Sequence, residues 1–344
     1  MKNQNGYTLI ELVVAAALML TVTSGLFAVI VNGLGSSALW SESADLHQRA
    51  RVAAETVTSE INAAGTGAQD GPLIRFLPVI EPRRRGFAAG VNAITIRYVP
   101  VNGSSSTLTA DLAPDMSAAA VAVAPGCRVG TTACGFVAGT DVILYDRSGN
   151  FDVATVQAIA PASLVLANVT GVRSVTYPAG SQVAQLVETT LFFDPAERQL
   201  RREQPGASPV PVVDNVVDFQ LTYFGDPLPP SEPLPPIGTA NCLATSTGAT
   251  LPQPVIYADS GGLALLPLSM LTDGPFCGVG AGAYDVDLLR VRSVRVVMRM
   301  QTGVDALRGV DPRWFARPGS ATNRGRMIPD ETVSLDLSPR NLQR

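Results

Sequence analysis

Residues 1–20 read MKNQNGYTLIELVVAAALML, and this stretch decides the architecture of the chain. Glu11 stands at the edge of an apolar run, and no charged side chain follows it from Leu12 to Trp40. About 20 apolar residues are enough for a helix to cross a bilayer, and a carboxylate in hydrocarbon costs roughly 2.5–3.5 kcal/mol. The position of Glu11 therefore needs a reason.

Three kinds of amino-terminal segment compete for residues 1–31. A cleaved secretory signal needs a basic start, a short apolar core and a small-residue cleavage site. Here Lys2 is the only basic residue before the apolar run, the run is too long, and Glu11 falls where the core should be purely apolar. A plain signal anchor fits the length but leaves Glu11 unexplained. The third alternative is a prepilin leader.

The stretch Gly6-Tyr7-Thr8-Leu9-Ile10-Glu11-Leu12 resembles the start of type IV pilins and type II secretion pseudopilins. In those families a glycine, an aromatic residue and a glutamate precede the apolar helix at fixed offsets. The resemblance implies that a prepilin peptidase cuts between Gly6 and Tyr7 and that the new amino group of Tyr7 is methylated. Tyr7 replaces the usual phenylalanine but keeps an aromatic ring, so processing is expected.

The amine created by cleavage supplies a role for Glu11. An unpaired charge in a medium of low dielectric constant is far more costly than a paired one. As the fifth residue of the mature chain, Glu11 is expected to offset the Tyr7 amine of a neighbouring subunit and to fix the axial register between subunits. The alternative is an interfacial glutamate in an ordinary anchor, without a partner.

The helical pattern continues beyond Trp40 and becomes amphipathic. Apolar residues recur there at steps of three and four, with charged residues between them, until Gly65 ends the pattern. We expect one helix from Tyr7 to Ala64, about 87 Å long at 1.5 Å per residue, with a transmembrane part at about residues 10–32. His47, the single histidine, is expected on its solvated face.

From residue 91 the apolar period changes to two, which predicts β-strands. The expected strands are 91–99, 141–145, 151–159, 164–169, 183–193, 199–202, 217–223, 288–301 and 332–337. A polar hairpin turn is expected at 147–150. A calcium loop is the weaker alternative, because the spacing of Asp146, Asn150 and Asp152 does not fit one.

The 288–301 segment shows two further features. Its apolar phase slips near Ser293, which predicts a bulge or bend. It also carries four arginines, for which solvent-facing strand positions compete with a basic patch: Arg290, Arg292, Arg295 and Arg299. Since no aromatic residues alternate with them to stack on bases, the solvent-facing interpretation is preferred.

The four cysteines are Cys127, Cys134, Cys242 and Cys277, all in Gly-, Pro- and Ala-rich segments. In a cytosolic chain they would be plain thiols, whereas in an exported chain they predict the disulfides Cys127–Cys134 and Cys242–Cys277. Residues 225–284 include the run PLPPSEPLPP, which cannot join a central strand. This segment is expected to be a surface insertion closed by the second disulfide.

Composition and motifs favour no catalytic role. The net charge of −4 implies no general attraction to nucleic acid. The chain lacks a nucleophile–base motif, a phosphate-binding loop and a Cys/His zinc pattern, so no enzyme, cofactor or metal is expected.

The expected fold class is α+β and pilin-like. It comprises a leader (1–6), a helix (7–64) whose distal half packs on an antiparallel β-sheet head, and a β-rich head (65–344). Three segments resemble the heads of PilW-type minor pilins and J-type pseudopilins: TTLFFDPAERQLRRE, VVDNVVDFQLTYFGD and LLRVRSVRVVMRMQT. The C-terminal segment ETVSLDLSPRNL resembles the ending of the PilW group.

The resemblance implies a structural minor pilin of a type IV pilus that helps to initiate or cap the fibre. A J-type pseudopilin of a type II secretion system is the alternative, and a singly anchored periplasmic binding protein is a third. The implied partners are prepilin peptidase, other pilins and the inner membrane, with no nucleic acid. The head is expected in the periplasm, and on the pilus or cell surface after assembly.

Overall fold

The computed structural model describes residues 8–68, 72–75, 77–83, 90, 92–100, 103–123, 135–168, 175–235, 237–258, 262–323 and 326–342. The chain forms two compact units. One unit is Met1–Ala50 with Met300–Glu331, and the other is Arg51–Arg299 with Thr332–Arg344.

Helix α1 (Leu9–Asn62) is one uninterrupted helix, as predicted, although it contains several glycines. It ends two residues before the predicted Ala64. Gly65 then adopts a left-handed conformation with φ 71°, which glycine tolerates without a steric penalty. The Gly65 amide donates to the Arg97 carbonyl at 3.0 Å, so the end of the helix is bonded directly to a strand of the second unit.

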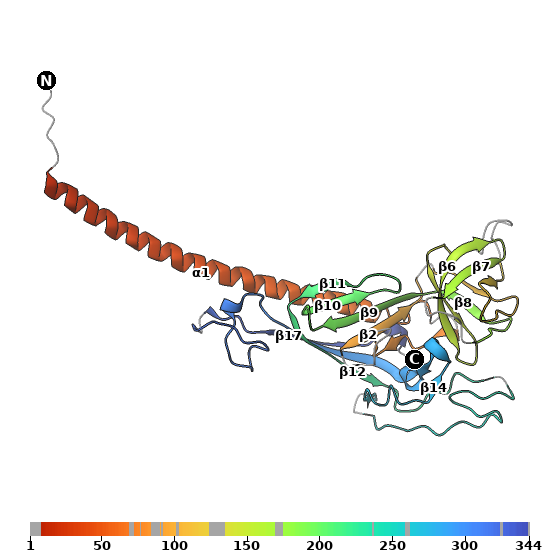
Figure 1. The fold of residues 1–344 in the computed structure, drawn as a ribbon. Coiled ribbons are helices and arrows are strands. Elements are labelled where there is room, and N and C mark those ends of the chain that lie inside the picture. Colours follow the sequence, from red (N-terminus) through yellow and green to blue (C-terminus); the bar gives the residue numbers. More distant parts are fainter. Residues whose placement is uncertain are drawn as a thin grey trace. The chain divides into compact units, whose positions relative to one another are not determined.

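A five-stranded antiparallel sheet lies in this second unit together with the last turns of α1 (Figure 1). Its strands, in spatial order, are β1 (Ile80–Glu81), β2 (Ala93–Tyr98), β9 (Val187–Asp194), β10 (Gln199–Glu203) and β11 (Val210–Asp214). Helix residues Ala53, Val57 and Ile61 are completely buried, and Glu60 pairs with Arg202 of β10 at 3.1 Å. The α+β class and the packed distal helix are therefore confirmed.

A six-stranded antiparallel sheet belongs to the same unit (Figure 1). Its strands, in spatial order, are β3 (Ser105–Thr107), β8 (Gln182–Gln185), β5 (Asp141–Tyr145), β6 (Phe151–Ala160), β7 (Ser163–Asn168) and β4 (Ala118–Ala120). One face covers an apolar core built around Leu108, Leu144, Val156 and Tyr177.

The remaining strands form a four-stranded sheet and a small ribbon. The sheet order is β13 (Ala264–Leu266), β12 (Val216–Gly225), β16 (Val291–Met300) and β17 (Glu331–Leu337), and the ribbon pairs β14 (Phe276–Cys277) with β15 (Tyr284–Asp285). The 3₁₀ helices are η1 (Pro72–Arg75), η2 (Gly280–Gly282), η3 (Val286–Arg290), η4 (Asp305–Leu307) and η6 (Arg340–Leu342).

The predicted single strand 183–193 is wrong. β8 ends at Gln185 in the six-stranded sheet, and β9 begins at Val187 in the five-stranded sheet, with Leu186 between them. Leu186 is itself buried, and its amide donates to the Asp141 carbonyl at 2.9 Å. Each of the two strands buries consecutive residues rather than every second one, so the residue pattern does not mark the change of sheet.

The predicted strand 288–301 begins too early. Residues up to Arg290 form η3, because the Asp285 side chain accepts from the Asp287 amide and caps this turn. The predicted change of phase is present: Ser293 and Val294 are both buried, and the buried residues then alternate from Val294 to Met300.

Strand β2 is buried on both faces, and Arg97 on this strand belongs to a buried ionic cluster. The alternation of apolar residues in the sequence does not predict this burial. Arg97 donates to Glu188 of β9 and to Glu81 of β1, each at 2.7 Å, and to the Pro78 carbonyl at 2.8 Å. All three charged residues are at most 5% exposed. Burial by itself lowers the pKa of Arg97, but the carboxylates of Glu188 and Glu81 more than reverse this and raise it. Arg97 therefore stays positively charged at physiological pH.

Candidate functional site

The first turn of α1 is closed by a reciprocal pair of side chains. The Thr8 amide and hydroxyl donate to Glu11 Oε2 at 2.9 and 2.8 Å, and the Glu11 amide donates to the Thr8 hydroxyl at 3.4 Å. This is a capping box, in which each residue satisfies a backbone amide that the helix leaves unpaired. Glu11 therefore has a local role in its own subunit, which the sequence analysis missed although Thr-x-x-Glu before an apolar run is its signature.

The apolar half of the helix presents its side chains outward. Leu9–Ile30 is the one described helical segment long and apolar enough to cross a membrane, and none of it is buried. Its polar side chains are satisfied within the helix: Thr21 donates to the Leu18 carbonyl at 2.8 Å and Thr23 to the Met19 carbonyl at 2.6 Å. Such bonds remove the cost of placing hydroxyl groups in hydrocarbon.

Four predicted site residues fall outside the described part of the chain. They are Gly6 and Tyr7, which form the expected cleavage junction, and Cys127 and Cys134, which form the first expected disulfide. Cleavage, methylation and this disulfide remain predictions.

Farther along the helix, Glu42 anchors the loop that follows β16 in the same unit. Its Oε1 atom accepts from the Thr302 hydroxyl at 2.7 Å and from the Gly303 amide at 3.2 Å. One turn on, His47 pairs with Glu331 at 2.8 Å while its side chain stays 68% exposed. His47 is thus on a solvated helix face, as expected, and it helps to hold the second end of the same loop.

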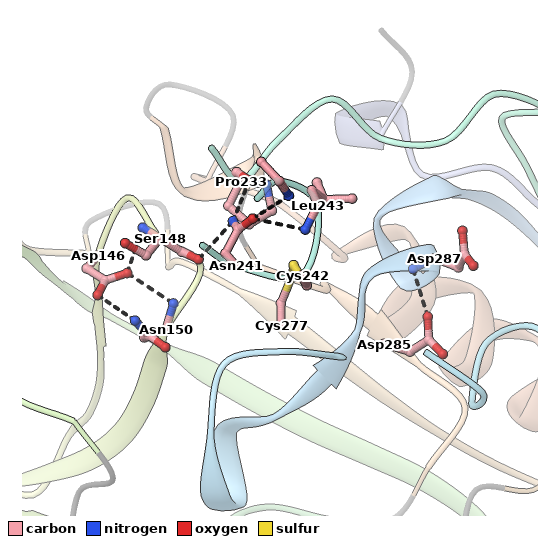
Figure 2. The surroundings of a disulfide bond; sticks show 11 residues. Asp146, Ser148, Asn150, Pro233, Asn241, Cys242, Leu243, Cys277, Asp285 and Asp287 are labelled. Atoms are coloured by element: carbon pink, nitrogen blue, oxygen red, sulfur yellow. Dashed lines mark hydrogen bonds between the residues drawn. A yellow bond between two sulfur atoms is a disulfide. The ribbon is translucent and has the colours of Figure 1, made fainter. Parts of the chain in front are cut away.

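In the head, the predicted disulfide Cys242–Cys277 is present and links two parts of the insertion, with the Cα atoms 4.9 Å apart (Figure 2). The adjacent Asn241 side chain accepts from the amides of Leu243 and Ala244, both at 2.9 Å, and donates to the Pro233 carbonyl at 2.7 Å. These bonds give the proline-rich segment a defined backbone without strand pairing.

The hairpin turn that Figure 2 shows beside the insertion is a polar turn, as predicted. Asp146 accepts from the amides of Ser148 and Asn150 at 2.8 and 3.0 Å, and from the Asn150 side chain at 2.8 Å. Its carboxylate is therefore used to fix the turn. Across the described residues, no group of three or more His, Cys, Asp or Glu side chains could hold a metal ion.

The prediction that Arg290 faces solvent is wrong, because its side chain is only 1% exposed. Arg290 donates to the carbonyls of Asp226 and Pro227 at 2.9 and 2.5 Å, and to that of Pro254 at 3.2 Å. Asp287 balances its charge at 3.0 Å. Joining these separate carbonyls requires a long cationic side chain with several donors in fixed positions, which arginine provides. Arg290 therefore holds the two ends of the proline-rich segment, at Asp226–Pro227 and at Pro254, by hydrogen bonds.

Asp285 lies next to this fastening and has an altered acidity. Burial raises the pKa of Asp285 to about 6, with the nearby charges of Asp287 and Asp273 adding to the rise. Hydrogen bonds from the Gly274 and Asp287 amides, at 2.6 and 2.9 Å, act in the opposite direction without cancelling it.

The raised pKa of Asp285 predicts a pH-dependent stability. Because the folded-state pKa lies above the ordinary value of 3.8, the contribution of Asp285 is fully present below about pH 4 and is lost as the pH rises through about 6. Asp285→Asn should therefore gain stability relative to wild type across this window, as measured by denaturant unfolding at a series of pH values. A constant difference between the two proteins would contradict the assignment.

A second prediction concerns the cysteines. Non-reducing peptide mapping of the exported protein should recover Cys242 linked to Cys277 and Cys127 linked to Cys134. The first pair closes 35 residues, for which the chain-entropy model gives roughly 3–4 kcal/mol of stabilisation. Free thiols or crossed pairing would show that the head does not fold as described.

Comparison with known families and proteins bears on the amino terminus. Residues 1–27 match the prokaryotic N-terminal methylation motif. No curated protein matches the chain. The motif covers the predicted cleavage junction, the capping box and most of the exposed apolar span, and behind it α1 leads into antiparallel sheets. This amino-terminal motif and this α+β architecture together support a type IV pilin-like protein.

Proposed function

We propose that the chain is a structural minor pilin of a type IV pilus, most similar to the PilW group, that enters the fibre or its tip and helps to start assembly. The observation that carries this proposal is the unburied apolar segment Leu9–Ile30 with Glu11 at its start. A helix that is apolar on all sides must lie in lipid or among other such helices. A pilin subunit occupies both environments in turn, first the inner membrane and then the fibre core.

The same segment defines the proposed partners. Prepilin peptidase would act at Gly6–Tyr7, and other pilins would contact the helix after extraction from the membrane. The head would lie in the periplasm before assembly and on the pilus afterwards. In this proposal the head serves in packing and presentation, without a catalytic step.

Glu11 can cap its own helix and also serve a neighbour. The described bonds from Thr8 all end on Oε2, whereas a carboxylate offers about four lone-pair positions on two oxygens. The remaining acceptor positions of the Glu11 carboxylate can accept hydrogen bonds from the Tyr7 amine of an adjacent subunit. Such a pair in a dry interface would mark one register among otherwise uniform apolar helices.

A deletion strain tests the role in pilus assembly and distinguishes it from the alternative role in a type II secretion system. Surface pili and type II secreted proteins would both be quantified in the wild type, the deletion strain and the strain complemented with the full chain. Loss of pili with normal secretion is the expected result. Loss of secretion with normal pili would assign the chain to the secretion pseudopilus, as a J-type pseudopilin. Unchanged pili and secretion would reject both assembly roles and favour a singly anchored binding protein.

A further inference from the structure

We propose that a loop of the first unit docks on the anionic phospholipid surface of the membrane that α1 crosses. The loop consists of residues 312–323 and 326–329 and is called the basic loop. The proposal rests on the membrane placement of the Leu9–Ile30 segment, and it does not depend on whether the chain serves a pilus or a secretion system.

The basic loop carries positive charge in an acidic chain. Between Asp311 and Asp330 the sequence contains arginines and no acidic residue, although the net charge of the chain is −4. Arg313 is offset by Asp311, at 2.6 Å. Arg317 and Arg326 are exposed and supply the net charge of the surface.

The acidic residues that flank the loop are engaged elsewhere. Asp305 pairs with Arg308, and Glu331 pairs with His47. Asp330 accepts from the Gln301 side chain at 2.9 Å and from the Ala316 amide at 2.6 Å. The carboxylates therefore shape the loop and hold its ends, while Arg317 and Arg326 remain exposed to solvent.

The anchoring of the loop places it close to the membrane. Its stem is bonded to Glu42 through Thr302 and Gly303, and Glu42 lies twelve helical residues beyond Ile30, or about 18 Å along the axis. The headgroup layer occupies roughly 5–8 Å of this distance. The remaining 10 Å or so is about one Debye length at an ionic strength of about 0.1 M, so the charges of the loop are attracted to an anionic surface there.

Aromatic residues at this level strengthen the inference. Trp314 of the basic loop is 56% exposed, and Trp40 of α1, two residues before Glu42, is 73% exposed. Phe315 is buried at 4% exposure, so the loop is seated on its own unit while Trp314 points outward. Exposed tryptophan beside arginine is the combination that favours a membrane interface. The membrane is preferred over a protein partner because the same chain already crosses it a few turns away.

Fluorescence of a single tryptophan tests the proposal. The chain has two tryptophans, so Trp40→Phe leaves Trp314 as the only reporter in the full-length protein. One copy would be placed in each nanodisc, with neutral phosphatidylcholine or with added phosphatidylglycerol, and quenching by headgroup-labelled lipid would be measured. We expect stronger quenching in the anionic discs, and its loss at high salt.

Charge variants identify the residues responsible. Arg317→Gln with Arg326→Gln should weaken docking about 25-fold, or about fivefold for each arginine removed. The matched control, Arg51→Gln with Arg295→Gln, removes two exposed arginines outside the basic loop and should leave quenching unchanged. Inorganic phosphate added to the protein in detergent should not shift the Trp314 emission.

Three results would overturn the proposal. They are equal quenching in neutral and anionic discs, equal loss in the variant and control pairs, and a phosphate effect in detergent that matches the lipid effect. If Trp314 became protected only when a second copy was added, the surface would instead bind a neighbouring subunit.

Discussion

Replacing Arg97 by methionine is expected to lower the free energy of unfolding of the head by about 3–5 kcal/mol. Arg97 is the shared partner of Glu188 and Glu81, and its loss leaves two buried carboxylates without their main cation. Glu81 keeps Arg83 at 2.8 Å, but this arginine is partly exposed. Glu188 is the more affected of the two, because its side chain is only 3% exposed.

The same cluster provides a compensating variant. Replacing a complete buried ionic group with neutral residues of similar size is often close to neutral, whereas removal of one partner is costly. Arg97→Met combined with Glu81→Gln and Glu188→Gln should therefore recover much of the loss. Denaturant unfolding would be compared with Arg51→Met, in which an exposed pair with Glu55 is removed and no measurable change is expected. A loss below about 1 kcal/mol for Arg97→Met would show that the cluster is solvated or otherwise compensated.

The second large effect is expected from Glu11→Val, which should leave cleavage and membrane insertion intact and sharply reduce incorporation into the fibre. Removing a charge from the edge of the span makes insertion more favourable. The Tyr7 amine of a neighbour would then be buried without compensation, at a cost of roughly 3–5 kcal/mol in a dry interface. The variant and wild type would be compared in sheared fibre and membrane fractions at equal expression.

The capping box supplies the controls for this experiment. Glu11→Gln keeps an acceptor for Thr8 and removes only the charge, because glutamine also serves at this position of the box. Thr8→Ala keeps the charge and removes the hydroxyl. We expect Glu11→Gln to be nearly as defective as Glu11→Val, and Thr8→Ala to be close to wild type. If instead Thr8→Ala fails and Glu11→Gln is incorporated, Glu11 serves its own helix and the pairing hypothesis is wrong.

Local periodicity was sufficient to predict much of the fold. The long helix, the strand at 216–225 and the turn after Asp146 each depend on residues that are close in sequence, and the structure places them near the expected bounds. The pairing of Cys242 with Cys277 was also predictable, because both lie in one translocated insertion. Predicting these features required no knowledge of how the sheets pack in the folded chain.

The features that could not be predicted depend on which distant segments of the chain cover a given side chain. Arg97 and Arg290 both occupy positions that alternate with apolar residues, and Arg290 was expected to face water for this reason. Arg97 is buried, and its guanidinium lies 5.6 Å from the ring centre of Phe151 on β6. Arg290 is covered by the insertion whose carbonyls it binds. The passage between sheets at Leu186 is hidden for the same reason, since a period of two does not identify the neighbouring strand.

The part of the candidate site that a sequence motif specifies could be predicted. The part that depends on contacts in the folded chain could not. The offsets of Gly6, Tyr7 and Glu11 suggested processing and pairing. The methylation motif at 1–27 agrees with processing, whereas the pairing of Glu11 stays a prediction. The bond between Thr8 and Glu11 became evident only from the helix start itself. The role of Glu42 depends on residues more than 250 positions away in the sequence, which no local pattern can reveal.

The mass of the mature amino-terminal peptide tests the central claim most directly. The protein would be isolated from membranes of cells that contain prepilin peptidase, and its amino-terminal peptide would be sequenced by mass spectrometry. The account predicts a chain that begins at Tyr7 and carries one methyl group on its amine. A chain that retains Met1, or that begins near Ala38 after the apolar span, would contradict it.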